Sequence, residues 1–227
     1  MAVRTSDKPE EYRRAAHDEA PGAVWLDAIR RFPDMKTLTE TDIVDLIRHP
    51  TDHSAATYAR LRRDAPVSAL VAVLRTRRAD PSVRRVVVDV LGYRRARSAV
   101  PLLIEALDDN DPSVRDAAAD ALGKIGDRRA GEALMRRLTV ESDRSLRHWL
   151  VASLGGVGYQ PAVPALLRLL SDPDSVVRHM AARSLGLLRA VEARAAIEEA
   201  LAREVDSYPR RQMEQTLEWL NSPELLE

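Results

Sequence analysis

The chain has 227 residues, and its 35 basic side chains balance 35 acidic ones, giving a formal net charge of zero. It contains no cysteine, which excludes disulfides, thiolate metal sites and cysteine nucleophiles. Apolar residues make up 45% of the chain but aromatic residues only 4%, as is typical of helices packed through leucine, valine and alanine. A protein that neutralises phosphates usually has a basic surplus, so this composition does not favour nucleic-acid binding.

The start of the chain, Met1 to Glu11, carries charges where a secretion signal needs an apolar run. No segment approaches the roughly eighteen uninterrupted apolar residues that a membrane-spanning helix requires. We therefore expect a cytoplasmic protein that does not cross a membrane.

The first third of the chain shows only weak repeat signals. Residues 1–18 are polar, and we expect them to be partly disordered. Residues 19–78 are expected to form divergent N-terminal helical repeats. Thr39-Glu-Thr-Asp42 resembles a capping box. Helices are expected over 23–31, from Thr39 to Ile47, and as a hairpin over 52–63 and 66–76.

Residues 79–204 contain four repeats with a period of about 31 residues, a spacing found in helical solenoids. Each repeat begins with an aspartate and has an arginine four residues later. The four starts are Asp80–Arg84, Asp111–Arg115, Asp143–Arg147 and Asp174–Arg178. Eight residues after each arginine comes a glycine that follows a leucine, and these glycines are Gly92, Gly123, Gly155 and Gly186.

Each repeated position has a physical reason. The aspartate is an N-cap, and Pro81 and Pro112 occupy the first helical position, where no N–H is needed. The Leu-Gly pair is expected to end this first helix, because glycine permits a left-handed turn. A second helix follows, spanning Ala99 to Asp108 in the first clear unit. Such hairpins bury their apolar faces only by stacking, and residues 205–227 are expected to supply a C-terminal capping helix.

The D-P-x-V-R start, the A-A-x-A-L-G end of the first helix and the apolar second helix closely resemble the bacterial HEAT-like repeats of the phycobilisome-lyase type. The resemblance covers residues 79 to 204. It implies an all-α, HEAT-like helical-hairpin solenoid of about five to six stacked repeats with divergent terminal caps. Such arrays serve in chromophore lyases, in one hydroxylase and in many binding proteins, so the resemblance specifies the fold better than the function.

The arginine column, Arg84, Arg115, Arg147 and Arg178, is expected to be partly buried beside the apolar stripe of the first helix. A buried guanidinium needs a charged partner. The aspartates that recur with the same period, Asp80, Asp111, Asp143 and Asp174, match the Asp–Arg ladder of HEAT repeats. We therefore favour a structural ladder over a row of phosphate-binding arginines.

His148 and His179 each follow a column arginine in adjacent repeats. In the HEAT-repeat hydroxylase that modifies deoxyhypusine, His-Glu pairs hold metal at what resembles this position, but here Trp149 and Met180 come next. Two imidazoles without carboxylates are poor ligands for a hard metal ion. We expect a solvated surface pair, no metal and no cofactor, and we expect Trp149 to pack in the core or between repeats.

The second helices are expected to line the concave face, where solenoids commonly bind their partners. Its outward positions carry mixed charges beside an apolar flank, which suits a protein partner better than nucleic acid. The candidate partner-binding residues are Ile104, Glu105, Asp108, Met135, Arg136, Leu167, Arg168 and Glu199.

The sequence therefore favours a non-enzymatic scaffold or adaptor that binds a protein of unknown identity on its concave face. A bilin-lyase-like enzyme or lyase subunit is the first alternative, although no catalytic residue carries over by motif. A nucleic-acid-binding HEAT protein is the second.

Overall fold

The computed structural model describes residues 38–48, 55–76 and 79–221. Within these ranges the chain is helical and has no strand, as the sequence predicts. The chain divides into two compact units, Met1–Ala72 and Val73–Glu227. The expected helix at 23–31 and the polar segment 1–18 lie outside the described residues.

The first unit contains α3 (Glu40–Arg48) and α4 (Ala55–Asp64), and α5 (Val67–Arg75) begins in it. The capping box at the start of α3 is confirmed. The Asp42 carboxylate accepts the backbone N–H of Thr39 at 3.0 Å, and the Thr39 hydroxyl accepts the N–H of Asp42 at 3.3 Å. These reciprocal bonds satisfy backbone donors that a helix start leaves unpaired.

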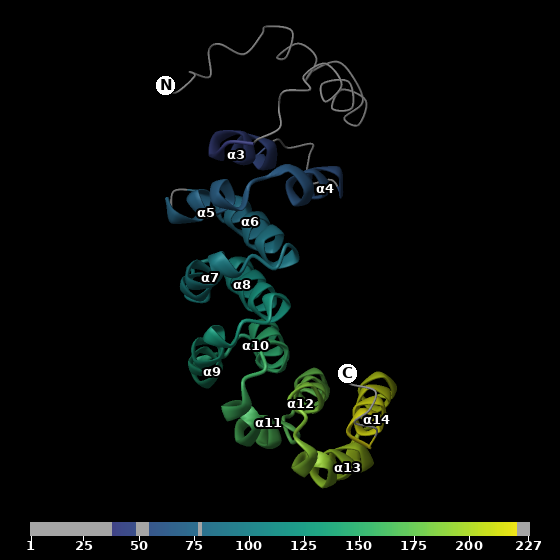
Figure 1. Ribbon diagram of the computed structural model, residues 1–227. Coiled ribbons are helices and arrows are strands. Elements are labelled where there is room, and N and C mark those ends of the chain that lie inside the picture. The colour runs from purple at the N-terminus through teal and green to yellow at the C-terminus, as the bar shows by residue number, and fades with distance from the viewer. Residues whose placement is uncertain (1–37, 49–54, 77–78, 222–227) are drawn as a thin grey trace, which may run out of the picture. The chain divides into compact units, whose positions relative to one another are not determined.

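The second unit is a solenoid of helical hairpins in two rows (Figure 1). The first helices of the hairpins, followed by the C-terminal helix, form the inner row: α6 (Pro81–Tyr93), α8 (Pro112–Ile125), α10 (Arg144–Gly156), α12 (Ser175–Leu187) and α14 (Ser207–Asn221). The second helices, each preceded by a short 3-10 turn, form the outer row: α7 (Val100–Ala106), α9 (Gly131–Val140), α11 (Val163–Leu169) and α13 (Arg194–Arg203). Helix α14 packs on α12 and α13.

The predicted aspartate caps position the inner helices. The carboxylates of Asp111, Asp143 and Asp174 each accept a backbone N–H from the first turn of the helix that follows, at 2.9 to 3.0 Å. Asp80 occupies the same N-cap position before Pro81. Because the carboxylates of Asp111, Asp143 and Asp174 satisfy otherwise unpaired donors, α8, α10 and α12 begin at the same place in their repeats.

The glycine column has a different role from the predicted one. Gly92, Gly123, Gly155 and Gly186 lie inside the last turns of their helices and have no positive φ. A Cβ atom on Gly123 would lie 2.7 Å from Ser153 Oγ on the next inner helix. The glycines therefore allow neighbouring inner helices to approach closely. A left-handed residue comes three positions later in all four repeats, at Arg95, Gly126, Gly158 and Arg189.

Serine hydroxyls join the inner helices where the glycines bring them together. Ser153 Oγ donates to the Ala119 carbonyl at 2.6 Å, and Ser184 Oγ donates to the Val151 carbonyl at 2.8 Å. Both serines are buried. These bonds between successive helices reinforce the inner row, since a buried hydroxyl without a partner would destabilise the fold.

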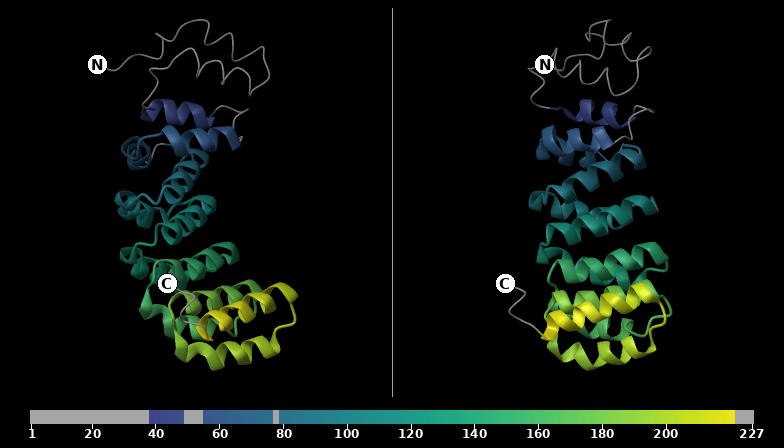
Figure 2. Two further views of the ribbon diagram at one scale, coloured as in Figure 1. Left: turned by 45° about the vertical axis from the view of Figure 1, so that its right-hand side comes forward. Right: turned by 90° about the vertical axis from the view of Figure 1, so that its right-hand side faces the viewer.

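The inner row lies on the inside of the bend of the second unit, and the outer row lies on the outside (Figure 1). Figure 2 (right) shows the inner row as a stack of closely spaced helices. Successive inner helices pack extensively on one another, whereas successive outer helices have few mutual contacts. The prediction that the second helices line the concave face is therefore wrong, because small residues draw the first helices together instead.

The arginine column forms a ladder, but its acids differ from the predicted cap aspartates. The ion pairs are Arg84 with Asp109, Arg147 with Asp172 and Arg178 with Glu204. Each acid lies shortly before the N-cap of the next inner helix. The Glu204 side chain is fully buried, and both of its oxygens accept from Arg178, at 2.8 and 2.9 Å. A buried carboxylate is stable only with such a partner.

The repeat at Arg115 departs from this pattern. Arg115 Nη1 donates to the backbone carbonyls of Asp109 and Asn110, at 2.9 and 3.2 Å. The acid of this repeat, Glu141, instead accepts from Arg137 of its own helix at 2.6 Å. Its second oxygen accepts the backbone N–H of Asp143 at 2.7 Å, so the acid still fixes the turn into α10.

Candidate functional site

The predicted partner-binding residues lie on the outer row or directly after its helices. The charged members are exposed and the apolar members, Ile104, Met135 and Leu167, are half-buried. Arg136 approaches Glu132 at 4.0 Å, and Glu199 pairs with Arg203 at 3.1 Å. Surface pairs of this kind contribute little to stability. That this surface binds a partner stays a prediction.

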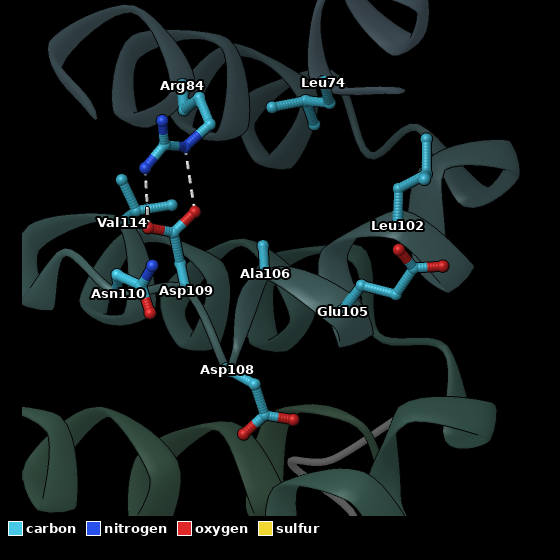
Figure 3. A pocket seen from close by; sticks show the side chains of 9 residues that line it. All are labelled: Leu74, Arg84, Leu102, Glu105, Ala106, Asp108, Asp109, Asn110 and Val114. Carbon is cyan, nitrogen blue, oxygen red and sulfur yellow. Dashed lines mark hydrogen bonds and ion pairs between the residues drawn. The ribbon is translucent and has the colours of Figure 1, made fainter. Parts of the chain in front are cut away.

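Two of these residues, Glu105 and Asp108, line a pocket of about 270 Å³ at the end of α7. Figure 3 shows Arg84 facing Asp109 in this pocket, with two hydrogen bonds of 2.7 and 2.8 Å between them. Burial raises the pKa of Asp109, but the hydrogen bonds from Arg84 and from the Asp111 backbone N–H, with the charge of Arg84, together hold that pKa below its ordinary value. The charged centre of the pocket is therefore part of the ladder.

A second cluster lies where α10 and α12 begin, on the inner row. His148 Nε2 lies 2.8 Å from Asp174 Oδ2, and the same carboxylate oxygen pairs with Arg144. The other oxygen, Oδ1, accepts the backbone N–H of Val176 at 2.9 Å. The hydrogen bond from Arg144, reinforced by His148, keeps the pKa of Asp174 far below its ordinary value. Asp174 is thus an ionised acceptor that orients the imidazole of His148.

His179 contradicts the prediction of a solvated histidine pair. It is only 3% exposed, and its ring meets that of Tyr208 edge-on with 5.4 Å between centroids. Its Nδ1 lies 3.1 Å from the Ser175 carbonyl, and its Nε2 is buried without a hydrogen-bond partner. Burial lowers the pKa of His179, so the ring is neutral at pH 7. Helix α14, which supplies Tyr208, covers this position.

Three large exposed side chains lie on the inner helices α10, α12 and α14. Trp149, predicted to pack in the core or between repeats, follows His148 on α10 and is 40% exposed, which excludes the core. Helices α8 and α12 flank α10, and α9 packs against it, so its exposed side faces the inside of the bend. Tyr208 is 55% exposed on α14, and Leu187 is 43% exposed on α12.

The site is therefore an exposed tryptophan beside an Asp–His pair, with exposed cations nearby. Arg144 is exposed at the start of α10, and Arg183 is exposed on α12. Trp149 lies two residues after the column arginine of α10, and Arg183 lies five residues after the column arginine of α12. Helix positions three residues apart share a face, so both side chains lie on the same face of the inner row. The arrangement suits a flat conjugated ligand that carries carboxylates, and it provides one group for proton transfer.

The described ranges contain no group of three or more His, Cys, Asp or Glu residues that could hold a metal ion. Within the same ranges no helix is both long enough and apolar enough to span a bilayer.

Comparison with known proteins supports this fold. The family model for HEAT repeats matches residues 67–155 and 141–218, which together make up more than half of the chain. A solved complex of CpcE and CpcF, the phycocyanin lyase of Nostoc sp. PCC7120, is similar with a TM-score of 0.52 and 22% identity, covering 81% of this chain and 95% of that chain. That likeness shows the same helical-repeat fold.

Curated relatives carry related names. Phycocyanobilin lyase subunit alpha of Nostoc sp. is 31% identical over 142 residues, covering 56% of this chain and 51% of that protein. The phycobilisome maturation protein of Synechococcus elongatus is 32% identical over 103 residues, covering 45% of this chain and 49% of that protein. The chain thus spans about half the length of the curated relatives it matches.

These relatives overturn the prediction of a non-enzymatic scaffold and favour the alternative of a bilin-lyase-like protein, since one is named as a phycocyanobilin lyase subunit and the other as a phycobilisome maturation protein. They also confirm that the repeats resemble those of the phycobilisome-lyase type. With the repeat model matched across the stacked hairpins, the chain belongs to the family of HEAT-repeat proteins.

Proposed function

We propose that this chain is a bilin-lyase-like protein that binds a bilin on its inner row and acts with a protein partner in attaching or removing it. The observation that carries the proposal is the match to lyase subunits across the HEAT repeats. The inner-row cluster of Trp149 and the His148–Asp174 pair provides a site of suitable chemistry. The cytoplasm is the proposed location.

The inner face matches the chemistry of a bilin. A bilin is an open-chain tetrapyrrole, flat where it is conjugated, with two carboxylate side chains. The exposed ring of Trp149 offers a stacking surface, and the exposed guanidinium groups of Arg144 and Arg183 offer charge-assisted hydrogen bonds to carboxylates. We expect the bilin to lie across α10 and α12.

The His148–Asp174 pair supplies acid–base chemistry. In the tautomer with the proton on Nε2, the Nε2–H group donates a hydrogen bond to the ionised Asp174, and Nδ1 keeps its lone pair. His148 can then accept the proton of an acceptor thiol while the sulfur bonds to one carbon of a bilin double bond. The proton is delivered to the other carbon, which completes the addition. Elimination is the reverse of these steps.

A protein partner is part of the proposal because the similar solved lyase is a complex of two chains. The partner would complete the bilin site or present the acceptor. The outer-row residues Arg136 and Arg168 remain candidates for its docking surface, since they are exposed.

The test mixes the full chain with phycocyanobilin and apo-phycocyanin, with and without the other subunit of a phycocyanin lyase. Covalently attached bilin is read as zinc-enhanced fluorescence on a denaturing gel. His148→Gln should slow attachment by about a hundredfold, the usual contribution of a general base, while the control Glu198→Gln, at an exposed position of α13, should not. The proposed activity would be refuted if the chain does not speed up bilin attachment, either with or without the other lyase subunit.

A further inference from the structure

The loops that join the inner helices to the outer helices carry a local positive charge that the overall balance hides. We define the basic edge as the loop residues 94–99 and 124–130, after α6 and at the end of α8. These segments contain six cationic side chains and one carboxylate, although the formal net charge of the whole chain is zero. The cations are Arg94, Arg95, Arg97, Lys124, Arg128 and Arg129.

The two loops of the basic edge lie against each other. Arg129 Nη2 donates to the Arg97 carbonyl at 3.3 Å and to Asp127 Oδ2 at 2.7 Å. The hydrogen bonds from Arg129, with help from the charge of Arg97, lower the pKa of Asp127 to about 2. The single carboxylate of the basic edge is therefore already paired with Arg129.

Three exposed arginines of the basic edge remain without an ion pair. Lys124 pairs with Asp120, but Arg95, Arg97 and Arg128 form no ion pair with any side chain in the described part of the chain. All three are exposed. Exposed guanidinium groups that are close together and unpaired repel one another and attract carboxylates.

Arg95 also has an unfavourable backbone conformation. Its φ is +50°, in the left-handed region, where the next two repeats have Gly126 and Gly158 with φ values of +69° and +67°. A side chain in this region costs about 1 kcal/mol relative to glycine. The fourth repeat also has an arginine in this conformation, Arg189 with φ +52°, so the fold accepts either glycine or arginine at this position.

The basic edge is short. The next loop along the solenoid, residues 156–162, has no charged residue, so no continuous positive stripe follows the stack. A nucleic-acid backbone needs such a stripe, whereas a short acidic segment needs only one patch. Tyr93, 59% exposed at the end of α6, adds the aromatic surface that protein interfaces combine with arginine.

We infer that the basic edge is a docking surface for an acidic segment of a protein partner, rich in Asp and Glu. Arg95, Arg97 and Arg128 bind its carboxylates, and Tyr93 packs against its apolar part. This inference does not depend on bilin binding, because the basic edge shares no residue with the His148–Trp149 site.

The test measures the fluorescence anisotropy of a labelled deca-glutamate peptide titrated with the full chain at low salt. Wild type should bind the peptide. The triple variant Arg95→Gln, Arg97→Gln, Arg128→Gln should raise Kd by at least about tenfold. A matched control, Arg85→Gln, Arg203→Gln, Arg211→Gln, removes the same charge from exposed positions outside the basic edge and should change Kd by less than about twofold. Circular dichroism checks that both variants keep their helices.

The same titration is repeated with one further variant and with one further ligand. Arg95→Gly removes one charge, relieves the backbone and should weaken binding about threefold without lowering Tm. A labelled ten-nucleotide single strand tests the other class of anionic partner. Absent peptide binding, equal effects of the two triple variants, or tighter binding of the oligonucleotide than of the peptide at the basic edge would each overturn the inference.

Discussion

Gly155 on α10 and Ser184 on α12 approach so closely that a Cβ atom on the glycine would lie 2.7 Å from the serine Cα. The contact recurs between Gly123 and Ser153 one repeat earlier. Backbone atoms on the facing helix cannot move aside as a flexible side chain can. This relationship sets the spacing of the inner row and with it the curvature of the face that carries the candidate site.

Gly155→Ala should destabilise the protein even though alanine is the better helix former. The added methyl group forces α10 and α12 apart, and overpacking of this kind costs about 1–3 kcal/mol. Thermal unfolding monitored by circular dichroism measures the effect. Arg95→Gly is the matched control at an open loop position and should leave Tm unchanged or slightly higher. A Gly155→Ala protein as stable as wild type would show that the inner helices are not held at this spacing.

Arg178→Met should be among the most destabilising single changes in the ladder. It leaves the fully buried Glu204 carboxylate without its cation, and loss of one partner of a buried pair costs about 3–5 kcal/mol. Urea unfolding gives the change in free energy. The double variant Arg178→Met, Glu204→Leu should recover much of the loss, because no buried charge remains. A double variant no more stable than the single one would contradict this account.

His179 should make stability depend on pH near neutrality. Burial lowers its pKa in the folded state, so the unfolded chain binds a proton first as pH falls below about 6.5. The free energy of unfolding is therefore highest above that pH and falls toward pH 5.5, by no more than about 1.4 kcal/mol. The groups around the ring are Tyr208 from α14, His148 from α10, and Arg183 and Glu204.

His179→Leu should remove this step, since leucine fills the buried position without a titrating group. The comparison is between urea unfolding curves at pH 7.5 and pH 5.5 for wild type and variant. His148→Asn is the matched control at the half-buried histidine of the same column. If wild type and His179→Leu lose the same stability over this range, the buried neutral histidine is not responsible.

Sequence alone predicted the hairpins, the aspartate caps and the existence of an arginine ladder, because each depends on contacts within one repeat or between adjacent repeats. It missed the true ladder acids, Asp109, Asp172 and Glu204, although they recur just before the caps with the same period as Glu141. The cap aspartates recur more regularly, so the sequence favours them as the partners of the arginines. Only side-chain geometry distinguishes a carboxylate that caps a helix from one that pairs with an arginine.

The direction of curvature and the site could not be predicted in this way. Curvature depends on which row packs more tightly, and the glycine column that decides it was interpreted as a helix stop. The burial of His179 depends on Tyr208 from α14, which lies outside the repeats. Trp149 is exposed on the inside of the bend because the first helices form the inner row. The prediction that the second helices line the concave face therefore placed the expected binding surface on the opposite side of the solenoid.

The most direct test of the central claim is a titration of phycocyanobilin with the purified full chain, followed by induced circular dichroism in the visible band. Bilin bound on the inner row predicts a saturable signal, a Kd at least about tenfold higher for Trp149→Ala, and an unchanged Kd for the outer-row control Met135→Ala. No induced signal with wild type, or equal loss in both variants, would contradict a bilin site on this face.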